Sequence, residues 1–308
     1  MPTCPTNTIN DLLYKNTSWR IGLVVTAGCT LIACILSFKL LLNHWRNFNQ
    51  PKIQIPQTRL IFMVPIYAIG SAITYYSPDL SVYMTLLTSC YEAFLIWNFF
   101  TLLTLYVSEV ETELKAKLAQ MERQRLPIFR CIEVSPGHPI FLAYCKAGVI
   151  QLVVVRLLLT VISLFAEWFG KFCESSSSPQ FFHIYYQVFT TISLLIAMYA
   201  LLTFYQTVHH EIKRAGTFSQ FLAVKLAIFV QLLITIVVQL FVKTGKIVGN
   251  DIVTTNQYAI LVTSVLICKE MLIVAIFHWW AFSATPFVIT GSNTDTVKSF
   301  KSSLNFSD

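Results

Sequence analysis

The sequence has 308 residues, of which 55% are hydrophobic and only 12% are charged, and its mean hydropathy is +0.63. A soluble domain must keep a charged, wet surface, so this composition excludes one and places the chain in a bilayer. The net charge of +7 is expected to mark topology and contact with anionic membrane lipids, and it does not indicate nucleic-acid binding.

Seven apolar segments are long enough to cross a hydrocarbon core of about 30 Å, which takes roughly 20 helical residues. Their expected bounds are residues 21–42, 59–76, 80–107, 140–169, 181–208, 219–241 and 257–282. Pro65 and Gly70 interrupt the second. The bilayer offers the backbone no partners and the segments lack strand-like alternation, so each span is predicted to be helical. The sequence therefore predicts an all-α polytopic protein, with a seven-helix membrane domain over residues 21–288 and an N-terminal tail over residues 1–20.

The N-terminal tail is predicted to be lumenal or extracellular. Asn16-Thr17-Ser18 forms a glycosylation acceptor there, although it lies only a few residues from the first span. Cys4 and Cys173 both fall on this side; we expect them to be unpaired, and the alternative is a disulfide between them. No Cys-x-x-Cys pair occurs among the eight cysteines, so they indicate neither a metal site nor a disulfide framework.

The longest polar interruption, residues 108–139, separates the third and fourth spans. Apolar residues recur in it at helical spacing, which predicts that the third helix continues into the cytosol until Pro127. Its apolar edge is expected to rest on neighbouring loops, and the alternative is a docking helix for a partner. Cys131 and Cys145 flank the entrance of the fourth span as candidate lipidation sites.

The C-terminal tail, residues 289–308, is rich in Ser, Thr and Asn, which predicts disorder. Counting Lys and Arg on alternate sides of the spans gives the orientation. One side carries Lys39, Arg46, Lys52, Arg59, Lys115, Lys117, Arg123, Arg125, Arg130, Lys213, Arg214, Lys298 and Lys301, and the other only Lys15, Arg20, Lys171, Lys243 and Lys246. The first side is predicted to be cytosolic, with the C-terminus, and the N-terminus to lie outside or in the lumen.

Several ionisable residues fall within the spans. Lys146 and Lys225 lie about six residues inside the cytosolic ends, roughly 9 Å at the helical rise, so both are expected to snorkel to the interface. Glu92, Arg156, Lys269 and Glu270 lie deeper. An unpaired charge near mid-bilayer costs from about 3 to over 10 kcal/mol, so these residues need partners.

We therefore expect Glu92, Arg156 and Glu270 to converge around a polar cavity. Its lining is predicted to be extended by Asn98, Gln151 and Gln231. Lys269 cannot fully share the face of Glu270, because adjacent helical residues are about 100° apart. The alternative is that these charges only pin helices together.

The sequence gives little support for an enzyme. His209-His210-Glu211 is not a His-Glu-x-x-His motif, and His278 lacks a Cys or carboxylate ligand on its own turn. No nucleophile elbow or phosphate-binding glycine loop occurs. We expect no catalytic activity, cofactor or metal.

Six stretches carry a family resemblance: "MVPIYAIGS" from Met63, "CYEAFLIWNFF" from Cys90, "CKAGVIQLVVVR" from Cys145, "LLIAMYALLTFYQ" from Leu194, "FLAVKLAIFVQ" from Phe221 and "CKEMLIVAIFHWWAFSATPFV" from Cys268. Their order resembles the transmembrane protein 184 family, which is related to the organic solute transporter alpha subunit. The resemblance covers residues 20–290 and implies a seven-helix bundle. It also implies that polar family positions are occupied here by Glu92, Lys146, Gln151, Arg156, Lys225, Glu270 and His278. The lipidated cysteine cluster of some relatives is reduced here to Cys131.

The leading hypothesis is facilitative transport of an amphipathic, anionic organic solute. Arg156 and Lys269 would meet the anion, Glu92 and Glu270 would hold those cations in the empty site, and aromatic residues such as Tyr67 would contact the apolar body. The alternative is a membrane receptor or trafficking scaffold that moves no solute. The resemblance permits a single-span partner subunit or a homo-oligomer, at the plasma membrane or in a vacuolar, lysosomal or secretory membrane.

Overall fold

The fold is described from a computed structural model, over residues 16–108, 111–121, 124–125, 133–173, 179–212, 217–249, 253–288 and 296–304. Its helices are α2 Thr17–Arg46, α3 Pro51–Ile61, α4 Met63–Tyr76, α5 Ser81–Val107, α6 Glu111–Ala119, α7 Pro139–Trp168, α8 Phe182–Ile212, α9 Thr217–Lys243, α10 Thr255–Ala281 and α11 Thr296–Leu304. Short 3-10 turns cover Pro78–Leu80 and Thr285–Phe287, and two-residue strands β1 Gln124–Arg125 and β2 Glu133–Val134 pair antiparallel.

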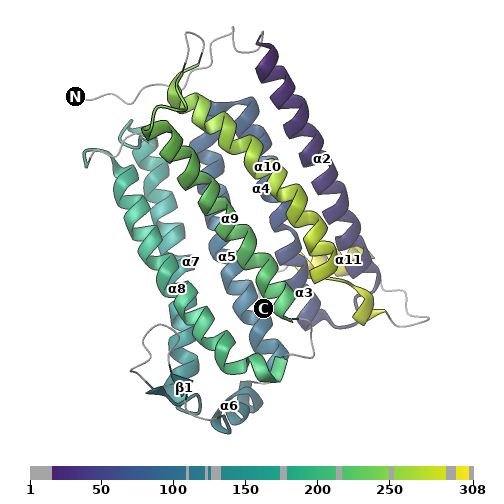
Figure 1. The fold of residues 1–308 in the computed structure, drawn as a ribbon. Helices are drawn as coiled ribbons and strands as arrows, with labels where there is room; N and C mark the ends of the chain where they lie inside the picture. The colour runs from purple at the N-terminus through teal and green to yellow at the C-terminus, as the bar shows by residue number, and fades with distance from the viewer. Residues whose placement is uncertain are drawn as a thin grey trace.

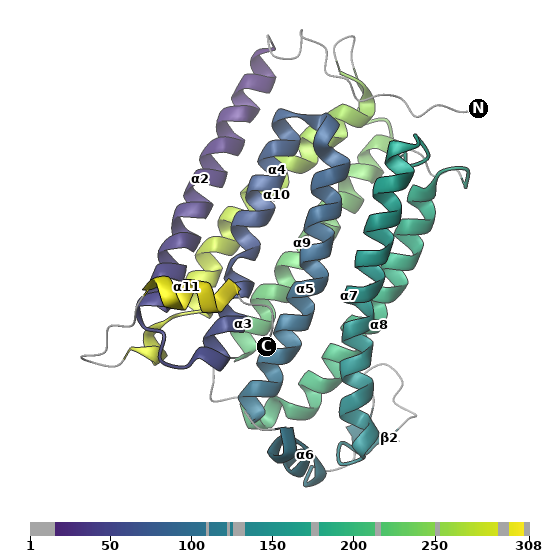
Figure 2. The ribbon, with the colours of Figure 1, turned by 180° about the vertical axis from the view of Figure 1, so that it is seen from behind.

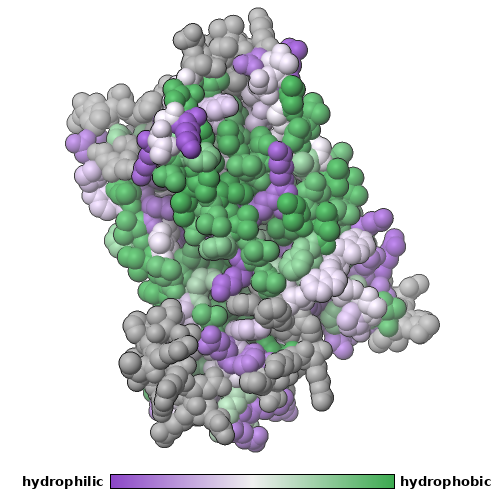
Figure 3. All heavy atoms as spheres, viewed as in Figure 1, coloured by the Kyte–Doolittle hydropathy of each residue, from purple (hydrophilic) through white to green (hydrophobic). Residues whose placement is uncertain are grey.

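Among the described residues, seven helical segments are long and apolar enough to cross a membrane, which confirms the predicted all-α, seven-span architecture. Two ends of the bundle can be named from α2: the Thr17 end, at the top of Figure 1, and the Arg46 end. Between them the surface is a broad apolar band, while hydrophilic residues gather toward the ends (Figure 3). The protein is an integral membrane protein.

The second span consists of two helices, α3 and α4, that meet at Phe62. Pro65 has no N–H to donate to the carbonyl of Ile61, so the hydrogen-bond ladder breaks where α3 ends. The regular bonds on either side of this gap remain, from Phe62 N–H to Thr58 O at 3.1 Å and from Ile66 N–H to Phe62 O at 3.3 Å. The span begins at Pro51, just over two turns earlier than the predicted start at Arg59.

Helix α5 runs through the middle of the bundle. The α7–α8 pair packs on one side of it, and α2, α4, α10 and α9 form the other side (Figures 1 and 2). The largest core cluster fills the half toward the Arg46 end, where Phe99, Phe100 and Phe204 are almost completely buried. Gly170 and Gly245 follow α7 and α9 with positive φ and end both helices, a conformation that favours glycine.

The third span does not continue to Pro127 as predicted. Helix α5 ends at Val107, Ser108 is extended, and α6 is a separate helix. Lys117 Nζ of α6 donates to Val107 O at 2.6 Å, which caps α5. Leu114 and Leu118 are buried in the main core. A straight continuation would have left these leucines in water, so burial outweighs helix continuity here.

The C-terminal tail was predicted to be disordered, but residues 296–304 form α11. It crosses the Arg46 end of α2 and α3 (Figure 2). Ser299 and Ser303 are buried, and Trp45 Nε1 donates to Ser303 Oγ at 3.2 Å. Lys298 and Lys301 are exposed. Serines on one face of a short amphipathic helix can thus pack and be satisfied, although their composition indicates disorder.

Candidate functional site

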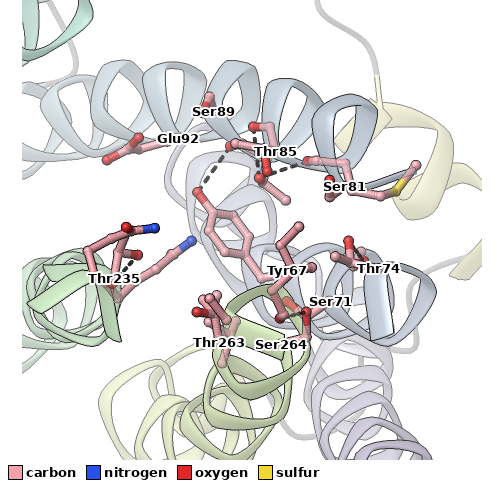
Figure 4. A pocket seen from close by; sticks show the side chains of 18 of the residues that line it. Tyr67, Ser71, Thr74, Ser81, Thr85, Ser89, Glu92, Thr235, Thr263 and Ser264 are labelled. Atoms are coloured by element: carbon pink, nitrogen blue, oxygen red, sulfur yellow. Dashed lines mark hydrogen bonds between the residues drawn. The ribbon is translucent and has the colours of Figure 1, made fainter. Parts of the chain in front are cut away.

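A polar pocket of about 230 Å³ lies between α4, α5, α9 and α10 (Figure 4). It begins near Ser81, Gln239 and Asn256 at the Thr17 end and reaches Glu92 and Gln231 near the middle of the bundle. Its lining is Tyr67, Gly70, Ser71, Thr74, Ser81, Met84, Thr85, Thr88, Ser89, Glu92, Gln231, Thr235, Gln239, Asn256, Ala259, Ile260, Thr263, Ser264 and Ile267. The volume is ample for several water molecules or part of a small solute.

Each wall of the pocket is one polar stripe of a helix. On α5, Ser81, Thr85, Thr88 and Glu92 recur at intervals of three or four residues, and Gln231, Thr235 and Gln239 recur at four on α9. Residues at these spacings share one helical face. The sequence-based prediction found Glu92 and Gln231 but missed the hydroxyl residues, for which this periodicity was the available signal.

Four hydroxyl groups in the walls are satisfied by their own helices. Thr74, Thr88, Thr235 and Ser264 each donate to a carbonyl four residues earlier, at 2.8–3.1 Å. Tyr67 reaches into the middle of the pocket from α4 (Figure 4), and its hydroxyl donates to Thr88 O of α5 at 3.1 Å. Because these protons are already engaged, the walls present oxygen lone pairs to an occupant.

Glu92 and Arg156 form an ion pair at the deep end of the pocket, as predicted. Arg156 Nη2 lies 3.1 Å from Glu92 Oε2, and their side chains are 8% and 16% exposed. Arg156 Nη1 also lies 3.4 Å from the Tyr186 hydroxyl of α8. The pair therefore ties α5 to α7 and α8. Glu92 borders the pocket, whereas Arg156 lies behind Glu92 and does not line it.

Two of the amides expected in the cavity bind elsewhere. Gln151 Nε2 donates to Ser193 O at 2.8 Å, and Ser193 Oγ donates to Gln151 Oε1 at 2.8 Å, which joins α7 to α8. Asn98 Oδ1 accepts from Arg59 Nη1 at 3.2 Å, toward the Arg46 end. Both side chains face neighbouring helices rather than the pocket. The position of a residue along a helix indicates which face it is on, but not which neighbouring helix offers it a hydrogen-bond partner.

Arg59 is a half-buried residue that the charge count assigned to a loop. It lies on α3 inside the bundle, where it contacts Asn98 and its guanidinium stacks over the Phe94 ring at 5.6 Å. Its Nε donates to Ser303 O of α11 at 3.2 Å. The side chain therefore joins the C-terminal helix to α3 and α5, and apolar composition around position 59 gave no signal for this role.

Adjacent residues Lys269 and Glu270 have opposite environments on α10. Lys269 is exposed and does not line the pocket, contrary to its expected place in the cavity. Glu270 is 6% exposed, and neither carboxylate oxygen has a hydrogen-bond partner within the described residues, although the Gln231 backbone lies near it. Tyr67 lies within electrostatic range of Glu92, Arg156 and Glu270. Glu270 thus lies near the ion pair without joining it.

The secondary polar positions also divide by burial. Lys146 is exposed and Lys225 is half-buried. His278 is completely buried, and both its ring nitrogens lack hydrogen-bond partners within the described residues. Its ring contacts the Phe282 ring at 5.0 Å.

A family model described as organic solute transporter Ostalpha matches residues 22–287, which is most of the chain. The chain belongs to the Ostalpha family.

Curated relatives of this Ostalpha chain are membrane proteins by name. A transmembrane protein 184 homolog of Dictyostelium discoideum is 26% identical over 90% of this chain and 54% of its own length. Vacuole membrane protein HFL1 of Saccharomyces cerevisiae is 29% identical over 82% and 59%, and hfl11 of Schizosaccharomyces pombe is 25% identical over 90% and 66%. The chain thus spans between half and two thirds of these relatives. No solved structure matches it.

The predicted modification sites of this Ostalpha chain have structural roles where they are described. Asn16 is the N-cap of α2, and its side chain accepts from Ser18 N–H at 2.9 Å. Cys145 is a buried free thiol, and Cys131 lies outside the described residues. Cys173 is disulfide-bonded, so the expectation that it is unpaired was wrong. Cys4, which the sequence offered as a bridging partner, lies outside the described residues.

Proposed function

We propose that the protein moves a polar organic solute across its membrane through the pocket between α4, α5, α9 and α10. The observation that carries this proposal is the polar lining, which extends from the Thr17 end to an ion pair near mid-depth. Deep polar groups in a membrane bundle mark solute or ion routes. Membership of the Ostalpha family supports the same conclusion.

The pocket chemistry favours a neutral or cationic solute that carries hydrogen-bond donors. The walls present hydroxyl lone pairs, and Glu92 is the one charged residue among the described lining residues. The sequence predicts an anionic solute bound by Arg156 and Lys269. Arg156 is engaged behind Glu92, and Lys269 is outside the pocket, so neither is placed to meet an anion there.

In this proposal the Thr17 end faces the lumen or the outside. The disulfide of Cys173 lies just beyond α7 at that end, and disulfides persist in oxidising compartments. The excess of Lys and Arg at the Arg46 end supports the same orientation. Two relatives are named as vacuole membrane proteins, so an endomembrane of the vacuolar type is the proposed location.

Flux into proteoliposomes tests transport directly. Purified chain would be reconstituted and assayed with three probes: mannitol as the neutral solute, agmatine as the cation and 2-naphthalenesulfonate as the anion. Saturable uptake of mannitol or agmatine is expected. Thr263→Phe, which fills the pocket from α10, should abolish uptake. Ile276→Phe is the control on the same helix, because Ile276 is 60% exposed on the outer surface, and it should retain uptake.

The alternative function is a receptor or scaffold that binds a solute without moving it. It is favoured by the closure of the bundle beyond the pocket: Gln57 Nε2 donates to the Tyr106 hydroxyl at 2.7 Å, and that hydroxyl donates to Gln220 Oε1 at 2.8 Å. These bonds join α3, α5 and α9 toward the Arg46 end. Saturable binding that Thr263→Phe removes, with no uptake of any probe, would support this alternative and contradict transport.

A further inference from the structure

A buried carboxyl group lies just beyond the pocket on α10. Ile267, one turn before Glu270, lines the pocket, and Tyr67 of the pocket wall lies within electrostatic range of Glu270. Glu270 is 6% exposed, and both carboxylate oxygens lack hydrogen-bond partners within the described residues. It lies 11 residues before Ala281, the end of α10, or roughly 16 Å at the helical rise.

An ionised carboxylate at this depth costs from about 3 to over 10 kcal/mol, so Glu270 requires a counter-charge. A metal cation needs several oxygen or nitrogen ligands at bonding distance. The described residues contain no cluster of three or more His, Cys, Asp or Glu, and the Gln231 backbone is the one polar group noted beside these oxygens, which make no hydrogen bond among the described residues. A proton needs no further ligand.

The described charged and titratable groups around Glu270 do not supply its counter-charge, which leaves a proton to neutralise it. Tyr67 faces it from α4, and the Gln231 backbone is the nearest polar group from α9. Helix α2 presents the thiols of Cys29 and Cys34 near Cys268. The ion pair of Glu92 and Arg156 lies beyond Tyr67 and is already neutral as a pair, Lys225 of α9 has a contact of its own, and Lys269 is exposed on the outer surface.

Two buried histidines continue toward the Arg46 end. His278 follows two turns later on α10 and packs its ring on Phe282, and neither of its nitrogens has a hydrogen-bond partner in the described parts of the chain. His44 of α2 makes a 2.9 Å hydrogen bond between Nε2 and Phe282 O, and its Nδ1 lacks a partner among the described residues. Proton-accepting atoms thus lie on both sides of Phe282, between Glu270 and the Arg46 end.

We propose that Glu270 is a proton-binding site whose proton enters from the pocket and leaves past His278 and His44, so that proton movement is coupled to solute movement. The eight-residue step from Glu270 to His278 rises about 12 Å, too far for direct transfer. A proton therefore crosses only when the bundle rearranges, as a coupled carrier requires and a proton channel does not. The site rests on geometry alone, whereas its coupling to a solute rests on the proposed transport function.

Infrared spectroscopy tests the proton site without any assay of transport. Purified wild-type protein at neutral pH should show the C=O stretch of a protonated carboxyl group in apolar surroundings. Glu270→Gln should remove this band, and the neighbouring Lys269→Gln should retain it. Size-exclusion elution and thermal unfolding check that the nearly isosteric variant is folded. A wild-type protein without the band, or a band that survives Glu270→Gln, would overturn the inference.

Proteoliposomes then test coupling, with mannitol as the probe. One proton moved with each solute lets a gradient of one pH unit support up to about tenfold accumulation. Wild-type and Lys269→Gln should accumulate mannitol, whereas Glu270→Gln should only equilibrate it. Accumulation by Glu270→Gln contradicts coupling and leaves transport standing. If the wild type moves no mannitol, coupling and neutral-solute transport both fail, and the infrared result still decides the proton site.

Discussion

The two halves of the bundle differ in how their polar side chains bond across helices. Toward the Arg46 end, amides bond across helices: Gln57 binds Tyr106, and Asn98 binds Arg59. In the pocket toward the Thr17 end, hydroxyls such as Thr88 and Thr235 bond to their own helix. Polar groups bonded between helices fix a packing, while those bonded within a helix leave the space between helices free. The difference indicates that one half is closed and the other open.

Glu92 and Arg156 lie at the boundary between these halves. Their pair holds α5 against α7, while Glu92 also borders the pocket. Three substitutions, ordered by the size of the expected effect, measure how different the two halves are.

The largest effect is expected from breaking the ion pair. Arg156→Leu leaves the Glu92 carboxylate without its counter-charge, which should lower the free energy of unfolding by about 3–5 kcal/mol, measured by detergent-induced unfolding in bicelles. The double variant Glu92→Leu/Arg156→Leu should recover much of this loss, because no lone charge remains. Lys146→Leu, at an exposed position, is the control. Equal losses in the single and double variants would show that the pair does not hold the boundary.

An intermediate effect is expected from the bonds that close the Arg46 half. Gln57→Leu removes the donor to the Tyr106 hydroxyl and should cost about 1–3 kcal/mol in the same unfolding assay. Gln239→Leu makes the matching change in the pocket, where Gln239 is exposed, and should change stability by about 0.5 kcal/mol or less. Similar losses at both positions would contradict the contrast between a closed and an open half.

Much of the fold could be predicted from sequence because the bilayer imposes a single requirement on every span. Helical hydrogen bonding and an apolar length gave seven spans near their observed bounds. The break at Phe62 was harder to predict, because the N–H that Pro65 lacks would have bonded to a carbonyl four residues earlier, at the end of α3. The prediction of a disordered tail failed for another reason: Trp45 and Arg59 of distant helices donate hydrogen bonds to Ser303 of α11, and the composition of the tail does not reveal these partners.

The contacts of charged residues in the site could be predicted from the sequence, whereas the contacts of neutral polar residues could not, because they depend on which helices are neighbours. Glu92 and Arg156 had to be paired at their depth, and they are. Gln151 and Asn98 needed only one hydrogen-bonding neighbour each, and the sequence did not show which helix provides it. Lys269 and Glu270 are adjacent in sequence, but the rotation between successive helical residues leaves Lys269 exposed and Glu270 buried. Helix rotation and helix neighbours are set by packing across the whole bundle.

The smallest effect on stability is expected in the pocket wall. Thr88→Val removes a hydroxyl that donates to Met84 O of its own helix, and the similar shape of valine should keep the change in unfolding free energy within about 0.5 kcal/mol. Mannitol binding should weaken by up to about tenfold, because one hydrogen bond contributes about 0.5–1.5 kcal/mol. Titration calorimetry measures the affinity, and uptake kinetics give an independent estimate.

Thr104→Val is the matched control for this last substitution. Thr104 lies on the same helix and donates in the same way, to Thr101 O at 2.7 Å, but does not line the pocket. It should leave mannitol affinity unchanged. If both variants weaken binding equally, helix α5 acts as a whole and the wall hydroxyls do not contact the solute. If only Thr88→Val does, the lone pairs that face the pocket bind solute, and the open half of the bundle is the binding half.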